Sequence, residues 1–144
     1  MLQSDWLIRF CKEEYHPFDG DRVNGYVVGD DYTPIWEIPD LNNFYKNGYS
    51  MKNSLFAHLD TIGIDTKKLE ENFRFAVGEI WEIQQHKIRK SNKDYNAKPG
   101  QFHEMFRMDF VLDESGNVFL LEVNMSPNLS SKTHSENAPL YRYV

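Results

Sequence analysis

Residues 102–124 read Phe102-His-Glu-Met-Phe-Arg-Met-Asp-Phe-Val-Leu-Asp-Glu-Ser-Gly-Asn-Val-Phe-Leu-Leu-Glu-Val-Asn124. Two apolar runs of strand length are separated by the polar sequence Glu114-Ser-Gly-Asn117, which is rich in turn-forming residues. We therefore predict two strands, over residues 102–113 and 117–124, joined by a two-residue turn at Ser115-Gly116.

The register of the predicted hairpin brings polar side chains together. Pairing of Glu114 with Asn117 across the turn would set the register of the two strands. In that register Asp109 lies directly opposite Glu122, and Asn124, two residues further on, points to the same face. The sequence therefore predicts that two carboxylates and one amide converge on a single patch.

Two opposed carboxylates repel each other unless a positive charge lies between them. The oxygen donors of Asp109, Glu122 and Asn124 suit Mg²⁺, which completes its coordination with phosphate oxygens and water. These residues accordingly indicate a Mg–nucleotide site. Two other interpretations stay open from the spacing alone: the polar face is simply solvated, or Arg107 forms an ordinary salt bridge with either carboxylate.

The opposite face of the hairpin is expected to pack into a core, which would hold the polar face in place. Strand alternation assigns to that face six apolar residues: Met108, Phe110, Leu112, Phe119, Leu121 and Val123.

Residues 66–90 have the clearest helical pattern in the chain. One face recurs there at three- and four-residue steps, through Leu69, Phe73, Ala76, Ile80, Ile83 and Lys87. A shorter helix is expected from Met51 to Leu59, with Gly63 after it, and a short strand over residues 6–11. Residues 15–43 combine turn dipeptides with large aromatic residues, which predicts an irregular but packed segment. The expected fold class is α+β.

The composition is typical of a globular domain, with 144 residues of which 40% are hydrophobic and 26% charged. The net charge of −6 argues against nucleic acid as the main partner, because phosphate binding requires clustered lysine and arginine. The single cysteine, Cys11, cannot form a disulfide within the chain. No apolar run approaches the ~20 residues of a membrane-spanning helix, and no secretory signal is recognisable.

The hairpin also carries a resemblance to a known family. Residues 102–113, together with Val118-Phe-Leu-Leu-Glu-Val-Asn-Met-Ser-Pro127, resemble the last conserved block of the tubulin–tyrosine ligase-like enzymes. The resemblance implies the C-terminal portion of an ATP-grasp fold, with an antiparallel sheet and a long packed helix. It further implies that Asp109, Glu122 and Asn124 are metal ligands that hold the phosphates of ATP.

A second match lies near the start of the chain. Trp6-Leu-Ile-Arg-Phe-Cys-Lys-Glu-Glu-Tyr15 is similar to the family's strand of Gly-Leu-Leu-Arg-Phe type. By this resemblance Arg9 helps to bind the carboxylate of the incoming amino acid, for which a guanidinium is well suited. The other interpretation is an arginine on the exposed side of a strand.

Other positions depart from the family. The middle of the chain lacks the family's His-Leu-Thr-Asn segment, and Arg107 stands where the family commonly has glycine. Arg107 would either contact a phosphate or weaken metal binding by repulsion.

The resemblance implies an enzyme, namely an ATP-dependent ligase that adds an amino acid, preferably glutamate, to tubulin or another acidic protein through an acyl-phosphate. ATP and Mg²⁺ are the expected cofactors, and a cytoplasmic or cytoskeleton-associated location is expected. Because nothing here matches the family's adenine pocket, we expect residues 1–144 to be a partial ATP-grasp domain without its N-terminal lobe, inactive alone. The alternative is a catalytically inactive descendant that binds microtubules or another protein.

Overall fold

The predicted β-hairpin forms, with slightly different bounds. In the computed structural model, which describes residues 2–142, strand β3 is Phe106–Leu112 and strand β4 is Val118–Met125. The two strands pair antiparallel in a two-stranded sheet. Asp109 lies directly opposite Glu122, so the register predicted for the polar face is confirmed.

The turn that joins the strands differs from the predicted two-residue turn. The N–H of Asp113 donates to the carbonyl of Asn117 (3.1 Å), and the N–H of Gly116 donates to the carbonyl of Asp113 (3.0 Å). The loop therefore contains three residues, Glu114, Ser115 and Gly116, and Gly116 adopts the left-handed φ of 77° that such a loop requires. The predicted pairing of Glu114 with Asn117 is wrong, because Asp113 takes that place.

A β-bulge at Leu121 compensates for this change in the turn. Phe110 lies opposite Leu120, whereas Asp109 lies opposite Glu122. Leu121 is therefore the extra residue that a bulge inserts into one strand. Without it, the three-residue loop would have placed Leu121 opposite Asp109, and the two carboxylates would not face each other.

The bulge also changes which residues of β4 share a face with Phe110. Directly opposed residues lie on the same face, so Val118 and Leu120 join Phe110. The prediction of a core on this side is wrong for three residues, since Phe119, Leu121 and Val123 are 52%, 67% and 40% exposed. For Phe119 and Leu121 the reason is the bulge, which interrupts the two-residue period on which the prediction rested. Val123 still lies opposite Met108, so the bulge does not explain its exposure.

Helix α3, Thr66–Asp94, contains the predicted helix of residues 66–90 and extends beyond it. Its N-terminus is capped by Asp65, whose carboxylate accepts hydrogen bonds from the N–H groups of Lys67 (3.1 Å) and Lys68 (3.0 Å). These bonds satisfy donors that have no partner within the helix, and they define where the helix begins.

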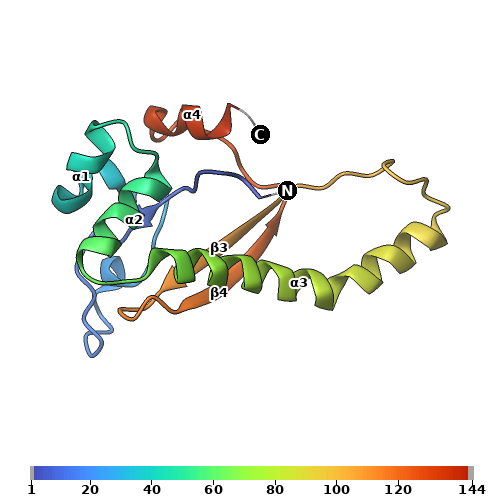
Figure 1. Ribbon diagram of the computed structural model, residues 1–144, viewed down its shortest axis with the longest axis horizontal. Coiled ribbons are helices and arrows are strands. Elements are labelled where there is room, and N and C mark those ends of the chain that lie inside the picture. Colours follow the sequence, from blue (N-terminus) through green and yellow to red (C-terminus); the bar gives the residue numbers. More distant parts are fainter. Residues whose placement is uncertain (1, 143–144) are drawn as a thin grey trace. The chain divides into compact units, whose positions relative to one another are not determined.

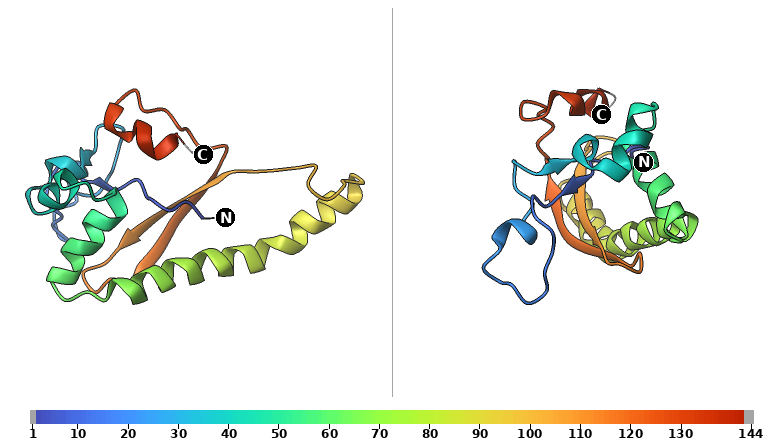
Figure 2. Two further views of the ribbon diagram at one scale, coloured as in Figure 1. Left: turned by 45° about the horizontal axis from the view of Figure 1, so that its top comes forward. Right: turned by 90° about the vertical axis from the view of Figure 1, so that its left-hand side faces the viewer.

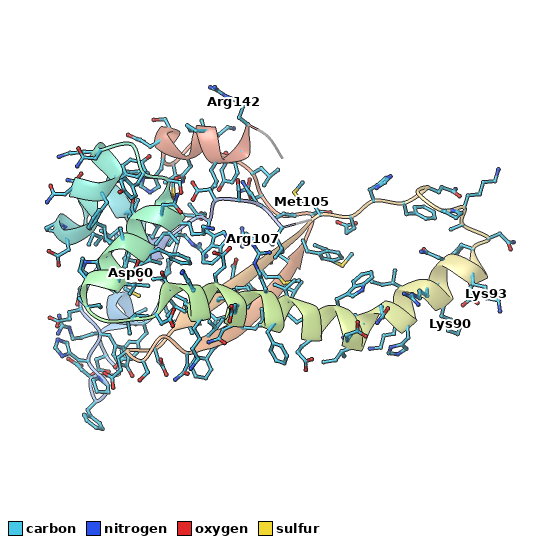
Figure 3. All side chains as sticks on the ribbon, viewed as in Figure 1. Asp60, Lys90, Lys93, Met105, Arg107 and Arg142 are labelled. Carbon is cyan, nitrogen blue, oxygen red and sulfur yellow. The ribbon has the colours of Figure 1, made fainter. Side chains whose placement is uncertain are left out.

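Only the first part of α3 packs against the hairpin. The ring of Phe73 meets the ring of Phe110 edge to face, with 5.0 Å between the ring centres. The second half of the helix runs past the strands (Figures 1 and 2), and Ile83 is 59% exposed. Lys90 and Lys93 extend from this far part (Figure 3). The predicted apolar face is therefore covered over part of its length only.

The chain divides into two compact units, of which Ile64–Asn128 contains α3 and the hairpin. The other unit comprises the residues before and after this range. Its elements are β1 (Arg9–Phe10), η1 (Val23–Gly25), β2 (Thr33–Pro34), η2 (Ile35–Glu37), α1 (Pro39–Lys46), α2 (Met51–Thr61), η3 (Ser135–Asn137) and α4 (Ala138–Tyr141). Strands β1 and β2 pair antiparallel in a second small sheet.

A small apolar core holds this other unit together. Ile35, Leu41 and Met51 are almost fully buried and pack with one another. At the N-terminus of α2, the carboxylate of Asp5 accepts hydrogen bonds from the N–H groups of Met51 (3.3 Å) and Lys52 (2.8 Å). A negative charge at this end of a helix is favourable, so Asp5 connects the start of the chain to α2.

The short predicted elements are confirmed in part. Helix α2 agrees with the helix expected from Met51, and Gly63 follows it with a left-handed φ of 87°. Strand β1 covers only two of the residues in the strand predicted over residues 6–11. Helix α1 was not predicted, because its first residue, Pro39, belongs to a turn-rich segment. The fold is α+β as expected, and no helix among residues 2–142 has the length and apolarity needed to cross a bilayer.

The hairpin turn leads to a prediction about pH. The Asp113 carboxylate accepts hydrogen bonds from the side-chain amide of Asn117 (2.8 Å) and from the N–H groups of Asn117 (2.8 Å) and Ser115 (2.9 Å). These donors, the Asn117 side chain above all, hold the pKa of Asp113 below the ordinary aspartate value of 3.8. A lowered pKa in the folded state stabilises the protein above pH 3.8, and that stability is lost as the pH falls through the folded-state pKa.

We therefore expect Asp113→Asn to lower the thermal midpoint at neutral pH and to have a smaller effect at about pH 2. Thermal unfolding followed by circular dichroism at the two pH values checks this. The matched control is Glu114→Gln, which neutralises the exposed carboxylate next to it and should show a much smaller pH-dependent difference. An equal loss at both pH values would mean that the charge of Asp113 is unimportant.

Candidate functional site

Four polar residues share one face of the hairpin and form what we call the carboxylate face: Arg107 and Asp109 of β3, and Glu122 and Asn124 of β4. Arg107 lies opposite Asn124, and Asp109 lies opposite Glu122. Alternate residues on a strand point to the same side, so the two pairs are neighbours along the sheet. The structure thus brings together the three residues that the resemblance predicts to be metal ligands, and places Arg107, a cation, beside them.

Arg107 is bound to both oxygens of Asp109. Its Nε lies 2.9 Å from Oδ1 and its Nη2 lies 3.1 Å from Oδ2 of that carboxylate. The same Nη2 is 4.0 Å from Oε1 of Glu122. Arg107 can be located in β3 in Figure 3. Of the interpretations that the spacing left open, the salt bridge between Arg107 and a carboxylate is present.

The second carboxylate has a neutral donor as well. The Nδ2 of Asn124 donates to Oε1 of Glu122 over 2.9 Å. The side chain of Asp109 is 15% exposed, while those of Arg107 and Glu122 are 36% and 60% exposed. The Asp109 carboxylate is therefore the shielded member of the pair, and the Glu122 carboxylate is open to solvent.

The donor chemistry of the carboxylate face fits Mg²⁺. Asp109 and Glu122 offer carboxylate oxygens and Asn124 offers an amide oxygen, which are the ligand types that Mg²⁺ prefers. A positively charged group already lies at these carboxylates, since Arg107 contacts Asp109. Within residues 2–142 no group of three or more His, Cys, Asp or Glu side chains is arranged to bind a metal. Two carboxylates and one amide are thus the set that is available here, and the remaining positions suit phosphate oxygens or water.

Two residues beside this face were not anticipated from the sequence. The N–H of Ser126 donates to the carbonyl of Met105 (3.2 Å) and to Oε1 of Glu104 (3.3 Å). Ser126 has a φ of 50°, a left-handed conformation that is uncommon for residues with a side chain. These contacts fix the chain direction immediately after Asn124. The sequence did contain a signal for this contact. If the pairing of the two strands is continued beyond their ends, Glu104 comes near Ser126.

Arg9 belongs to the other unit. It lies in β1, paired with Pro34 of β2, and its guanidinium carbon is 5.9 Å from the centre of the Tyr32 ring. This distance is within the range of a cation–π interaction, which orients the guanidinium. The role of Arg9 toward an amino-acid carboxylate stays a prediction.

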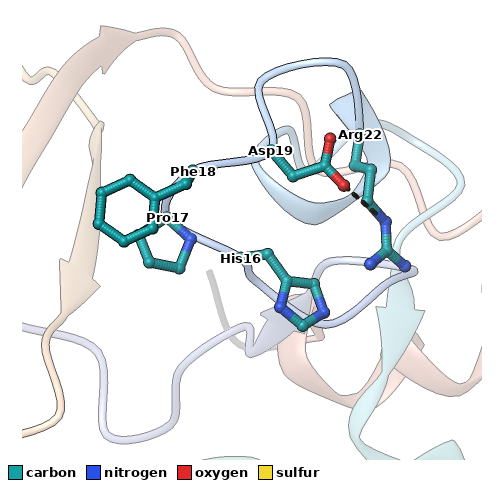
Figure 4. A pocket seen from close by; sticks show the side chains of 5 residues that line it. All are labelled: His16, Pro17, Phe18, Asp19 and Arg22. Atoms are coloured by element: carbon teal, nitrogen blue, oxygen red, sulfur yellow. Dashed lines mark ion pairs between the residues drawn. The ribbon is translucent and has the colours of Figure 1, made fainter.

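A surface pocket lies elsewhere in that unit, in the loop before η1. It is lined by His16, Pro17, Phe18, Asp19 and Arg22 (Figure 4). Asp19 and Arg22 are paired with each other at 3.9 Å, and Phe18 is fully exposed. Its one carboxylate is already paired with its one guanidinium, so the pocket lacks the pair of opposed carboxylates that makes the hairpin a candidate metal site.

The family can be stated directly. The sequence model described as the tubulin-tyrosine ligase family matches residues 2–143, and the chain belongs to this family. The resemblance inferred from the hairpin is thereby confirmed.

Several curated proteins are similar to the chain. It is 47% identical over 145 residues to the probable tubulin polyglutamylase ttll-15 of Caenorhabditis elegans, a match that covers 100% of this chain and 28% of the relative. It is 31% identical over 148 residues to tubulin polyglutamylase ttll-4 of the same organism, covering 99% and 24%. It is 28% identical over 145 residues to tubulin monoglutamylase TTLL4 of Mus musculus, covering 96% and 12%.

The chain thus spans about a quarter of the length of the Caenorhabditis relatives, or 28% and 24%. No solved structure matches the chain.

The ion pair on the carboxylate face generates a prediction about stability. Arg107→Gln leaves the shielded Asp109 carboxylate without its guanidinium and opposite a second negative charge. We expect it to lower the free energy of unfolding by about 1–2 kcal/mol in urea titrations with a metal chelator present. The matched control is Arg74→Gln, because Arg74 pairs with Glu70 at 2.9 Å in an exposed position on α3. That change should cost about 0.5 kcal/mol or less. Equal losses would show that shielding of Asp109 does not matter.

Proposed function

We propose that the protein is an ATP-dependent ligase of the ATP-grasp type that adds glutamate to tubulin. The observation that carries the proposal is the opposed pair Asp109 and Glu122 with Asn124 on the same face, in a chain of this family. The names of the similar proteins, tubulin polyglutamylase and tubulin monoglutamylase, support tubulin as the acceptor and glutamate as the added amino acid.

In this proposal Asp109, Glu122 and Asn124 hold Mg²⁺ and, through it, the phosphates of ATP. When bound, Mg²⁺ offsets the negative charge of the phosphate oxygens during transfer. The three side chains project from paired strands, so the hydrogen bonds of the hairpin maintain their spacing. Precise spacing matters because positioning and charge stabilisation account for most of the catalysis of phosphoryl transfer.

The proposed reaction has two steps. A carboxylate oxygen of the acceptor protein attacks the γ-phosphorus of ATP, which releases ADP and forms an acyl-phosphate. The amino nitrogen of free glutamate then attacks the acyl carbon, phosphate leaves, the nitrogen loses a proton and an amide bond forms. Arg9 holds the carboxylate of the incoming glutamate through its guanidinium.

The acceptor is tubulin or another acidic protein, and the setting we propose is the cytoplasm, at the cytoskeleton. The chain spans 28% of the length of ttll-15, and we propose this activity for the protein as a whole.

A second candidate function is favoured by one observation. Arg107 already neutralises Asp109 through two hydrogen bonds, at 2.9 and 3.1 Å. A hairpin whose carboxylates are paired internally needs no metal to be stable. The second candidate is therefore a non-catalytic member of the family that binds microtubules or another protein. Calorimetric titration with Mg–ATP separates the two candidates, since a pure binding module should give no metal-dependent heat.

We expect Asp109→Asn and Glu122→Gln in the full-length protein to reduce ATP-dependent incorporation of labelled glutamate into tubulin by about 100-fold or more. Even groups that merely orient metal ligands are worth about 10–100-fold. Parallel assays with glycine and tyrosine test the choice of amino acid. Glu114→Gln, in the same hairpin but away from the carboxylate face, is the matched control and should retain activity. Full activity in both site variants would refute the metal assignment.

The role of Arg9 is tested separately. Arg9→Lys keeps the positive charge but removes the planar fork that suits a carboxylate. We expect the KM for glutamate to rise by roughly tenfold while the KM for ATP stays the same. Arg22→Lys, which alters an arginine paired with Glu13 in the same unit, serves as the control. A change in the KM for ATP alone would contradict the assignment.

A further inference from the structure

Arg107 places a positive charge at the carboxylates that the proposed function assigns to a metal ion. Its guanidinium contacts both oxygens of Asp109, at 2.9 and 3.1 Å, and reaches toward Glu122 at 4.0 Å. A planar guanidinium matches a carboxylate with two parallel hydrogen bonds, which are among the stronger ones in proteins. The face therefore already contains a positive charge of its own, supplied by the chain two residues before Asp109.

The positive charge of Arg107 is permanent. An arginine side chain does not lose its proton in proteins, so a metal ion cannot gain access to the Asp109 oxygens through deprotonation of the guanidinium. A lysine or histidine in this place could give up its charge, whereas Arg107 can only move away. A metal ion that takes the lone pairs of Asp109 now facing Arg107 must break these two hydrogen bonds.

The guanidinium is also able to move. Within the part of the chain that the structure describes, the hydrogen bonds and ion pairs of Arg107 go to Asp109 and Glu122. Its side chain is 36% exposed, compared with 15% for Asp109. Leaving Asp109 therefore gives up, besides the Asp109 bonds, only the long 4.0 Å contact with Glu122 among these polar contacts of the described residues, and it takes a long, flexible side chain into water. Displacement is feasible, and its free-energy cost is the strength of the ion pair.

We propose that Arg107 is an intramolecular competitor of the divalent metal, and that the metal binds the carboxylate face only by displacing it. The inference rests on the proposed function, because it takes Asp109 and Glu122 to be metal ligands. It assigns to Arg107 a positioning role in the metal-free protein, where it prevents the two carboxylates from repelling each other. The same contact weakens the affinity for free metal.

The test measures binding of Mn²⁺ alone, without nucleotide, to the full chain. Binding is followed by the loss of the electron paramagnetic resonance signal of free Mn²⁺. Arg107→Gln removes the competing charge and should tighten Mn²⁺ binding about tenfold, which corresponds to about 1.4 kcal/mol. Arg107→Lys keeps the charge without the two-pronged contact, so its affinity should lie between those of the wild type and Arg107→Gln. Adding Asp109→Asn to Arg107→Gln should abolish the gain.

Arg74→Gln is the matched control, because it removes one positive charge from an ion pair elsewhere in the same unit. It should leave the Mn²⁺ affinity within about twofold of the wild type, since exposed charges at a distance are screened by salt. The control separates local competition from the general effect of a more negative protein. Circular dichroism of each variant confirms that it is folded. If Arg107→Gln does not fold, the test is decided by whether Arg107→Lys binds Mn²⁺ more tightly than the wild type.

Two contrary results are distinguishable. If the wild type binds Mn²⁺, Asp109→Asn abolishes binding and Arg107→Gln changes nothing, the metal site stands but Arg107 is not a competitor. If neither the wild type nor folded Arg107→Gln binds Mn²⁺, the proposed metal site is wrong and the inference fails with it.

Discussion

Two carboxylates that face each other across a pair of strands require a positive charge between them. The hairpin holds Asp109 opposite Glu122, and the backbone hydrogen bonds of β3 and β4 prevent the pair from separating. Arg107 meets the requirement from within the chain by binding both oxygens of Asp109. The rest of the hairpin can be understood as the structure that maintains this arrangement, and any metal chemistry must begin from it.

The arrangement depends on two local features that offset each other. The loop of Glu114, Ser115 and Gly116 is one residue longer than a tight two-residue turn, because Asp113 binds the N–H groups that follow it. The bulge at Leu121 adds one residue to β4 and restores the pairing beyond it. The contact between Phe73 and Phe110 then holds α3 against this sheet. A change in either the loop or the bulge alone would move one carboxylate out of register with the other.

The two candidate functions give different roles to the ion pair between Arg107 and Asp109. In the proposed ligase, Arg107 would be a temporary partner of Asp109 that gives way to a metal ion, and the strength of the ion pair would set the metal concentration that binding requires. In a binding module, the ion pair is the final state of the hairpin and simply stabilises it. The family is the same in both cases. The difference lies in one side chain that is partly exposed and able to leave, so binding measurements on Arg107 variants bear on function as well as on stability.

The sequence by itself determined the hairpin and the long helix that begins at Thr66, because these follow from local periodicity. It also predicted that Asp109 meets Glu122, but from a turn pairing that the structure corrects, and the bulge at Leu121 makes up the difference of one residue. It also identified the family, through a block of residues that is contiguous in the chain. Tertiary structure decided the bulge at Leu121 and the exposure of Phe119. It also decided that Arg107 pairs with Asp109, of the two carboxylates within its reach. A bulge depends on how both strands pair at once, and burial depends on what a helix covers. The partner of an ion pair depends on side-chain geometry, which no pattern of residue types specifies.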